Sequence, residues 1–548
     1  MKKLMMIGGA VVAILSIEAK ASTVAYWPLA GENGVRTTTE TVFANEGDGG
    51  TMDAVPVTIQ TITGEINASS TINCYPIGTN AFPAAFGVYD PVAGENLPCA
   101  TGLDFDARYF TDNWNTSNKA GIPQYSCWWK GALRVTDPDA LKRSTFTVEI
   151  FVRPNPAMKG YYQYIAAMPF GNASGKTMGQ ACWAIAFDNK GKMYAVFTIG
   201  GTSKSYFPSA AMPNFFDGRW HHMAITVSGT ALKMYADYAL VGSGTLDGEV
   251  AYLEDGDLFI GATPHHCFSY HGSMAHFRVS DEALTSDKFL HFTRTEKASD
   301  EASDVFLHIN FEPVDGISTN NIAFNQAATG PAVHFGATNN TSVAGYAQLV
   351  SDVYTNKLYG SRRDYKGYDN MRSFSRTDNS AGDPFFSWLP PEDVFHDSSF
   401  TVEFFMNTSS FSAWSHLFKR RVDANDTENQ FWIGGLKTAD RLKCDFGGQT
   451  ITDTSSIGDS KWNHIAVVYD KPNRKLAFYR NWSKIGEKSV TESSIKEATV
   501  TPITIAGCTP SGTTYIGLMD EIRITKRALT AREFLSPKHP KGLMIILR

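Results

Sequence analysis

The stretch GLMDEIRITKRALTAREFL, residues 517–535, contains the pattern that decides the fold. Its first half alternates between apolar and polar residues, which predicts a half-buried β-strand. Ile522 and Ile524 would face a core, whereas Glu521, Arg523 and Thr525 would face outward. The sequence TARE, residues 530–533, matches a capping box and predicts a short helical turn. We therefore expect a late strand of a sheet, followed at once by a turn that closes over the sheet.

A degenerate copy of this string, HGSMAHFRVSDEALTSDKFL, occupies residues 271–290. Two further pairs of segments recur in the same order. STFTVEIF (144–151) matches SSFTVEFF (398–405), and WHHMA (220–224) matches WNHIA (462–466). Internal repetition of this kind indicates that the chain contains two copies of one fold.

The composition favours strands over long exposed helices, because only 19% of the residues are charged. Short alternating segments are separated by Gly, Asp and Asn turns in both copies, as is typical of antiparallel sandwiches. The predicted fold class is all-β, with two tandem antiparallel β-sandwich domains. The expected organisation is a signal peptide (1–21), a first domain (22–295), a linker (296–303), a second domain (304–537) and a C-terminal tail (538–548).

The N-terminus has the features of a cleaved secretory signal. Lys2 and Lys3 precede an apolar run over residues 4–17, and Ala19-Lys20-Ala21 provides a cleavage site. The run is shorter than the roughly 20 residues that span a bilayer, so we expect a secreted protein of the periplasm, cell surface or extracellular space and not an integral membrane protein. Removing residues 1–21 changes the net charge from −6 to −8, which argues against a nucleic-acid partner.

Seven cysteines follow the predicted cleavage site, and in an oxidising compartment they could form disulfides. The odd number leaves at least one thiol unpaired. Cys444 and Cys508 are the pair available to the second copy, and Cys74 with Cys99 is a candidate pair in the first copy.

The repeated segments resemble bacterial laminin-G-like domains of the concanavalin A-like superfamily. The resemblance rests on the strand FTVE-aromatic, the strand W-x-H-x-A and the closing string, and it covers both halves. VAYWPLAGENG (24–34) and DVFLHINFEP (304–313) hold the place of the first strand in each half. The resemblance implies two jelly-roll domains. The superfamily contains lectins, adhesion modules and relatives of laminarinase-type hydrolases, so the fold alone does not give an activity.

Hydrolysis by the family's enzymatic branch requires two carboxylates that flank the scissile bond. Glu149 and Glu403 stand on repeated strands, but Phe151 and Phe405 occupy their i+2 positions, and the hydrolases' E-x-D-x-x-E pattern is absent. In GLDFDAR, Asp104 and Asp106 do share a face, but a solvent-facing or calcium-binding edge is favoured over a catalytic pair. We therefore predict a protein that is not an enzyme and needs no cofactor, with calcium as the candidate cation.

A second candidate metal site is HHCFSYHGSMAH (265–276), in which the imidazoles of His265, His266 and His271 could bind zinc or copper. The second copy has no equivalent residues, which favours a polar loop. His222 and His464 lie in a repeated strand between apolar neighbours, and we interpret both as hydrogen-bonded histidines of the core or the sheet surface.

Recognition by surface aromatics is the remaining hypothesis, because aromatic faces offer apolar area with a polar edge. Six such residues lie outside the repeated strands: Trp128, Trp129, Tyr161, Tyr162, Trp388 and Trp414. We predict an exported non-catalytic protein that binds carbohydrate through loops or the concave face of its two domains. One alternative is a cell-envelope structural or adhesion protein with extracellular or envelope protein partners. Another is a glycoside hydrolase-like enzyme that uses a carboxylate pair.

Overall fold

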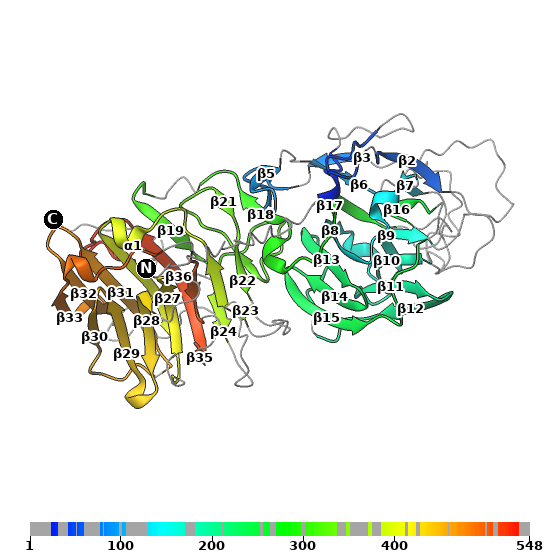
Figure 1. The fold of residues 1–548 in the computed structure, drawn as a ribbon. Coiled ribbons are helices and arrows are strands. Elements are labelled where there is room, and N and C mark those ends of the chain that lie inside the picture. Colours follow the sequence, from blue (N-terminus) through cyan, green and yellow to red (C-terminus); the bar gives the residue numbers. More distant parts are fainter. Residues whose placement is uncertain are drawn as a thin grey trace, which may run out of the picture.

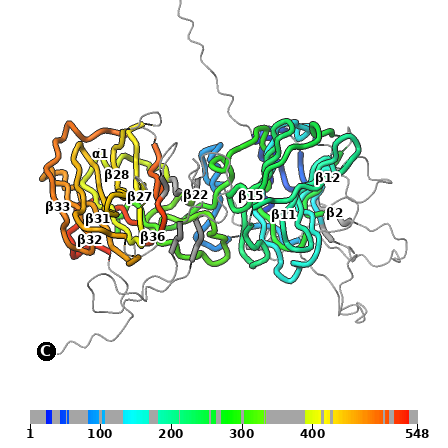
Figure 2. Tube along the Cα trace, turned by 90° about the horizontal axis from the view of Figure 1, so that it is seen from below, coloured from blue at the N-terminus to red at the C-terminus, as the bar shows by residue number. Residues whose placement is uncertain are grey.

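The computed structural model describes two β-sandwiches arranged side by side (Figures 1 and 2). It describes residues 23–30, 42–50, 52–59, 77–80, 82–97, 101–105, 130–136, 138–169, 181–210, 212–252, 256–262, 270–297, 302–336, 347–350, 371–374, 385–411, 415–423, 428–458, 460–498, 501–507 and 513–535. Within these ranges no helix is both long and apolar enough to cross a membrane.

The first domain consists of two antiparallel sheets, which we name 1A and 1B. Sheet 1A has the order β15 (Ala239–Thr245), β14 (Ala231–Ala236), β13 (His221–Ser228), β8 (Thr145–Pro154), β17 (Gly272–Ser280), β6 (Thr101–Asp104) and β3 (Ile77–Asn80), and β1 (Thr23–Trp27) also pairs with β17. Sheet 1B has the order β12 (Thr202–Tyr206), β11 (Met193–Ile199), β10 (Ala181–Phe187), β9 (Gln163–Pro169), β16 (Leu258–Ile260), β7 (Lys130–Val135) and β2 (Ala54–Ile59).

The second domain repeats this arrangement in sheets 2A and 2B, with two additional short strands in sheet 2B. Sheet 2A has the order β33 (Ser483–Ser489), β32 (Lys475–Arg480), β31 (Trp462–Asp470), β26 (Phe400–Asn407), β36 (Gly517–Thr525), β24 (Met371–Phe374) and β23 (Ala347–Val350), and β19 (Val305–Ile309) pairs with β36. Sheet 2B has the order β30 (Gln449–Thr452), β29 (Arg441–Phe446), β28 (Asn429–Leu436), β27 (Ser415–Arg421), β34 (Ile503–Ile505), β25 (Phe385–Trp388), β22 (Val333–Gly336) and β20 (Ile322–Ala323), and β35 (Thr513–Thr514) pairs with β27 in parallel. The predicted all-β class and the duplication are confirmed.

Each core lies between the two sheets of its domain. In the first domain Val148 and Ile150 of β8 pack with Trp183 and Ile185 of β10. In the second domain Val402 of β26 and Ile433 of β28 belong to the corresponding cluster, together with Ile522 and Ile524 of β36. The one short α-helix of the described ranges, α1 (Val394–Asp397), buries Val394 and Phe395 in the same core.

The outer face of sheet 1A is covered by a third layer. This bridging sheet consists of β21 (Gly330–Pro331), β18 (His291–Arg294), β4 (Phe86–Asp90) and β5 (Glu95–Leu97), and it lies between the two sandwiches (Figures 1 and 2). The segment after β19 joins this layer, since the backbone N–H of Trp220 donates to the carbonyl of Gly316 and the N–H of Ser318 donates back to Trp220, both at 2.8 Å. Chain from the second repeat is therefore packed against the first domain.

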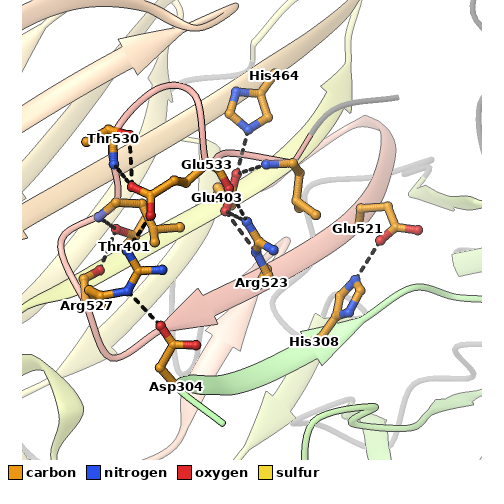
Figure 3. Close-up of polar contacts among 12 residues, drawn as sticks. Asp304, His308, Thr401, Glu403, His464, Glu521, Arg523, Arg527, Thr530 and Glu533 are labelled. Atoms are coloured by element: carbon orange, nitrogen blue, oxygen red, sulfur yellow. Dashed lines mark hydrogen bonds and ion pairs between the residues drawn. The ribbon is translucent and has the colours of Figure 1, made fainter. Parts of the chain in front are cut away.

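The polar side of β36 differs from the expectation. Glu521 and Thr525 point away from the core, yet both are buried, at 0% and 2% exposure. Nε2 of His308 on β19 lies 2.6 Å from Oε2 of Glu521, so a charged or polar partner accompanies the buried carboxylate (Figure 3). A polar residue of an alternating strand can thus be buried when another side chain provides its hydrogen bond.

The closing segment forms a turn after β36 instead of the predicted helical turn. The backbone N–H and the hydroxyl of Thr530 both donate to Oε2 of Glu533 at 2.8 Å (Figure 3). The N–H of residue 533 donates to the backbone carbonyl of Thr530 and not to its hydroxyl. Half of the capping box is therefore formed, and residues 531–534 are turn and bend.

Candidate functional site

The same buried ion cluster stands on the outer face of sheets 1A and 2A. In the first domain Oε2 of Glu149 lies 2.8 Å from Nε2 of His222, and Nε of Arg278 donates to Oε1 of Glu149 at 2.7 Å. In the second domain Glu403 has the same partners, His464 at 2.9 Å and Nε of Arg523 at 2.9 Å (Figure 3). The sequence interpretation of the two histidines as hydrogen-bonded interior residues agrees with this geometry.

Both carboxylates also hold the closing segment of their domain. The N–H of Leu290 donates to Glu149 at 2.7 Å, and the N–H of Leu535 donates to Glu403 at 2.7 Å. Burial by itself raises the pKa of a carboxyl group, but Arg278 and His222 bring the pKa of Glu149 below its ordinary value. His464 and Arg523 likewise lower the pKa of Glu403 despite its burial. Both carboxylates are fully buried, serve the fold and are not accessible to a ligand.

An aromatic cluster with two exposed rings lies instead on the outer face of sheet 1B. Tyr164 of β9 lies opposite Ala186 of β10, which lies opposite Tyr194 of β11. Phe207 follows β12 directly, and its ring stacks on that of Tyr194 with centroids 5.2 Å apart and planes at 18°. Because Ala186 has no bulk, the rings of Tyr164 and Tyr194 come within 6.4 Å, although they stand two strand spacings apart, about 9.5 Å.

Tyr162, just before β9, completes this group, which we name the aromatic strip (Tyr162, Tyr164, Tyr194 and Phe207). Its ring meets that of Tyr194 edge to face at 6.4 Å. Tyr162 is 40% exposed and Phe207 is 51% exposed, whereas Tyr164 and Tyr194 are buried beneath them. Burial raises the pKa of both buried phenols, so they remain protonated donors at neutral pH.

The row beside the strip is made of small and apolar residues. Ala184 of β10 lies opposite Ala167 of β9 and Val196 of β11, and Phe259 of β16 lies opposite Ala167. Ala167 and Ala184 are fully buried, and Val196 and Phe259 are only 4% and 8% exposed. The outer face of sheet 1B thus presents two exposed aromatic rings, Tyr162 and Phe207, beside a buried apolar row, and a sugar ring can stack on exposed rings of this kind.

The aromatic residues predicted from the sequence have different positions in the structure. Tyr162 is in the strip, and Tyr161 beside it in the chain is partly exposed. Trp388 is partly buried against the second core, and its ring lies 5.3 Å from that of Phe306. The remaining candidates, Trp128, Trp129 and Trp414, lie outside the described residues.

The predicted acidic and metal-ligating residues are not brought together in the part of the chain that the structure describes. Asp104 ends β6, opposite Ser273 and Ile77, and Asp106 lies outside the described residues. His271 is buried, with its N–H donated to Oε1 of Gln163 at 2.9 Å, and His265 and His266 lie outside the description. Among the described residues no group of three or more His, Cys, Asp or Glu side chains is arranged to hold a metal ion.

The predicted pairing of Cys444 with Cys508 is not formed. Cys444 is a free thiol in the second core, and its burial raises its pKa. Its side chain points into the core from β29, as do those of Leu442 and Phe446 two residues before and after it. A free cysteine at such a position packs as a small apolar side chain and needs no disulfide partner. Cys74, Cys99 and Cys508 lie outside the described residues.

Sequence reasoning missed Tyr164, Tyr194 and Phe207 because it sought ligand-binding aromatics outside the strands. A signal was present in ACWAIAF (181–187), where large core residues alternate with alanines. Alanine at every outer position is unusual for a strand that faces water, and it indicates that something flat packs there.

Comparisons with known proteins agree with the fold. The family model for the concanavalin A-like lectin/glucanases superfamily matches residues 130–288 and 382–534. Domains LG4–5 of the mouse laminin alpha1 chain are similar at 13% identity and a TM-score of 0.23, over 76% of this chain and 93% of that chain. Domain 4 of an extracellular arabinanase from Geobacillus stearothermophilus, in complex with arabinotriose, is similar at 15% identity and a TM-score of 0.25, over 42% and 97% of the two chains.

A carbohydrate-binding module of a Ruminococcus gnavus sialidase, bound to alpha2,3 sialyllactose, is similar at 16% identity and a TM-score of 0.22, over 26% of this chain and 82% of that chain. No curated protein matches the sequence. The two regions of the family match cover more than half of the 548 residues, and each coincides with one sandwich. The chain therefore belongs to the concanavalin A-like lectin/glucanases superfamily and contains two laminin-G-like domains.

Proposed function

We propose that this chain is an exported, non-catalytic protein that recognises carbohydrate, and that the outer face of sheet 1B is its principal contact surface. The observation that carries the proposal is the aromatic strip, in which two exposed rings, Tyr162 and Phe207, are braced by the buried rings of Tyr164 and Tyr194. Aromatic side chains of this kind offer a large contact area and lose little conformational entropy on binding.

The arrangement suits a saccharide better than a protein partner. The axial C–H bonds of a sugar ring form an apolar face that packs on an aromatic ring, and its hydroxyls need nearby donors and acceptors. Ala167, Ala184 and Ala186 are themselves buried, so the exposed rings of Tyr162 and Phe207 are the parts of this face that a sugar ring would contact. The phenol group of Tyr162 would supply a polar contact, since Tyr194 is buried.

A non-catalytic role is supported by the state of the repeated carboxylates. Glu149 and Glu403 are fully buried and engaged by arginine and histidine partners. Neither can reach a glycosidic bond, and neither has a second carboxylate beside it on its strand. Export is supported by the N-terminal sequence, with its basic start, apolar run and small-residue cleavage site.

A glycan array probed with the full chain tests the proposal, once with calcium and once with a chelator. We expect binding to a defined set of saccharides that Phe207→Ala weakens and Leu389→Ala does not, since Leu389 is equally exposed, at 54%, but lies in the second domain. Absence of binding on the array would refute the carbohydrate assignment. Release of reducing ends from a bound polysaccharide would refute the non-catalytic assignment.

A further inference from the structure

The outer face of sheet 2B has a different chemistry from the equivalent face of sheet 1B. In the first domain Ala186 lies between Tyr164 and Tyr194. In the second domain the same position on the equivalent strand, β28, is Gly434, which lies opposite His416 of β27 and Lys443 of β29. The two buried tyrosines of the strip, Tyr164 and Tyr194, are thus replaced by a histidine and a lysine.

The neighbouring row shows the same replacement. Ala184, flanked by Ala167 and Val196, corresponds to Trp432, flanked by Lys419 and Asp445. Phe259, opposite Ala167, corresponds to Thr504, opposite Lys419. None of the seven positions in sheet 1B is charged, whereas their counterparts in sheet 2B include two lysines and one aspartate.

Trp432 organises this second face. It lies against Gly434, where an added Cβ would overlap the indole ring and come within 2.6 Å of the Ser415 carbonyl. Its Nε1 donates to Nδ1 of His416 at 2.6 Å, and Nζ of Lys443 lies 5.4 Å from the indole ring centroid, a cation–π distance. Glycine at position 434 is therefore what allows the indole to hold both His416 and Lys443 in place.

The electrostatics of this face favour an incoming anion. Burial, together with the nearby charges of Lys419 and Arg421, lowers the pKa of His416 to about 3, so its ring is neutral at pH 7. Since Nδ1 accepts from Trp432, the ring proton is on Nε2, which is a donor. The seven equivalent positions hold two lysines, Lys419 and Lys443, and one aspartate, Asp445, which lies 3.0 Å from Lys443. Arg421 at the end of β27 adds a third cation; it is partly exposed, as is Lys443, whereas Lys419 is buried.

We propose that the basic face of the second domain (His416, Lys419, Arg421, Trp432 and Lys443) binds an anionic substituent of a saccharide, a carboxylate or a sulfate. The proposal rests on the proposed function and deepens it, because it divides recognition between the domains. The aromatic strip contacts a neutral sugar ring, and the basic face contacts the charged group. Sheets 1B and 2B would then bind different parts of one acidic polysaccharide, or two different polysaccharides.

The test measures binding of the full chain at low ionic strength to dextran sulfate, to unmodified dextran and to polygalacturonate. Dextran and dextran sulfate share one backbone, so their difference isolates the sulfate, and polygalacturonate supplies the carboxylate. We expect at least one of the two anionic polymers to bind more tightly than dextran. Lys419→Met combined with Lys443→Gln should weaken that binding roughly tenfold or more, as expected when charge-assisted contacts are lost.

Lys475→Gln combined with Lys484→Gln is the matched control, because these exposed lysines lie on β32 and β33 of sheet 2A. If the buried Lys419 variant fails to fold, as judged by circular dichroism and thermal unfolding, Lys443→Gln and Arg421→Gln each carry the test alone. Equal affinity for dextran and both anionic polymers would overturn the proposal, and so would equal losses in the control pair. The Phe207→Ala variant on the glycan array tests the first domain only. Failure of the proposed function can therefore be distinguished from failure of the basic face, which the lysine variants test on the anionic polymers.

Discussion

Oε2 of Glu403 lies 2.9 Å from Nε2 of His464 in the interior of the second domain, where both side chains are fully buried. Glu149 and His222 repeat this relationship in the first domain. Each glutamate also binds an arginine of the late strand and the backbone of the closing segment. The repeated FTVE, W-x-H-x-A and R-x-x-x-x-A-L sequences are therefore three parts of one buried junction.

Glu403→Gln should destabilise the second domain by about 3–5 kcal/mol, because it removes one charge from a buried ion cluster and leaves Arg523 without its counter-charge. Chemical denaturation of the full chain, followed by tryptophan fluorescence, measures this loss. Glu487→Gln, which removes an exposed partner of Lys484, should change stability by less than about 1 kcal/mol. Similar losses in the two variants would contradict the role of the junction.

The contribution of Glu403 should depend on pH in a definite direction. Its pKa is lower in the folded protein than its ordinary value, so the stabilisation is present above the unfolded pKa of about 4.3 and is lost as the pH falls through the folded pKa. The difference in stability between the wild-type protein and Glu403→Gln should therefore be constant from pH 6 to 7 and shrink below about pH 4. Thermal unfolding over that range checks the prediction, and a difference that grows on acidification would refute it.

His221 should stabilise the contact between the first domain and the segment from the second repeat, with the opposite pH dependence. Burial by itself lowers its pKa, but Asp237 and Asp217, at 3.0 and 3.1 Å, raise the pKa to about 9. Ser318 donates to the same Asp237 carboxylate at 2.6 Å. The contribution of protonated His221 to the free energy of unfolding is complete below the unfolded pKa of about 6.5, where it amounts to ~3 kcal/mol. It is lost as the pH rises through 9.

We therefore expect His221→Gln to lower the melting temperature strongly at pH 6 and to have much less effect at pH 10. His396→Gln serves as the control, since His396 is partly exposed and paired with the exposed Asp397. A deficit that is the same at pH 6 and pH 10 would show that the imidazolium charge does not matter.

Gly434→Ala should displace the Trp432 indole, because the added Cβ has no room beside it. We expect a loss of roughly 1–3 kcal/mol from overpacking, together with a change in tryptophan fluorescence. Gly160→Ala is the matched control, as nothing lies within 4 Å of its Cβ position. An unchanged spectrum in Gly434→Ala would argue against the packing of Trp432 on this glycine.

The duplicated sandwich could be predicted because its signals are local and repeated. The alternation around Ile522 and Ile524 fixes which face of β36 meets the core, and each repeated segment occupies the same strand in both domains. Burial of Glu521 and Thr525 could not be predicted in this way. It depends on partners such as His308, which is far from Glu521 in the sequence and meets it only through the pairing of β19 with β36.

The aromatic strip illustrates the same limit. Tyr162 could be chosen from the sequence because it lies outside the repeated strands. Its neighbours Tyr194 and Phe207 could not, since their contact depends on the register between β11 and β12 and on the small Ala186 between Tyr164 and Tyr194. The alternation of apolar and polar residues can be recognised within one strand. The residues that lie opposite it in the sheet depend on strand pairing and register, which the whole fold determines.

The most direct test of carbohydrate recognition by sheet 1B is isothermal titration of the full chain with the best saccharide from the array. We predict that Tyr162→Ala and Phe207→Ala each weaken the affinity by roughly tenfold, as loss of a stacked aromatic contact costs about 1–3 kcal/mol. Leu389→Ala should bind as the wild-type protein does. Unchanged affinity in both aromatic variants, with all four proteins folded, would contradict the assignment of this surface.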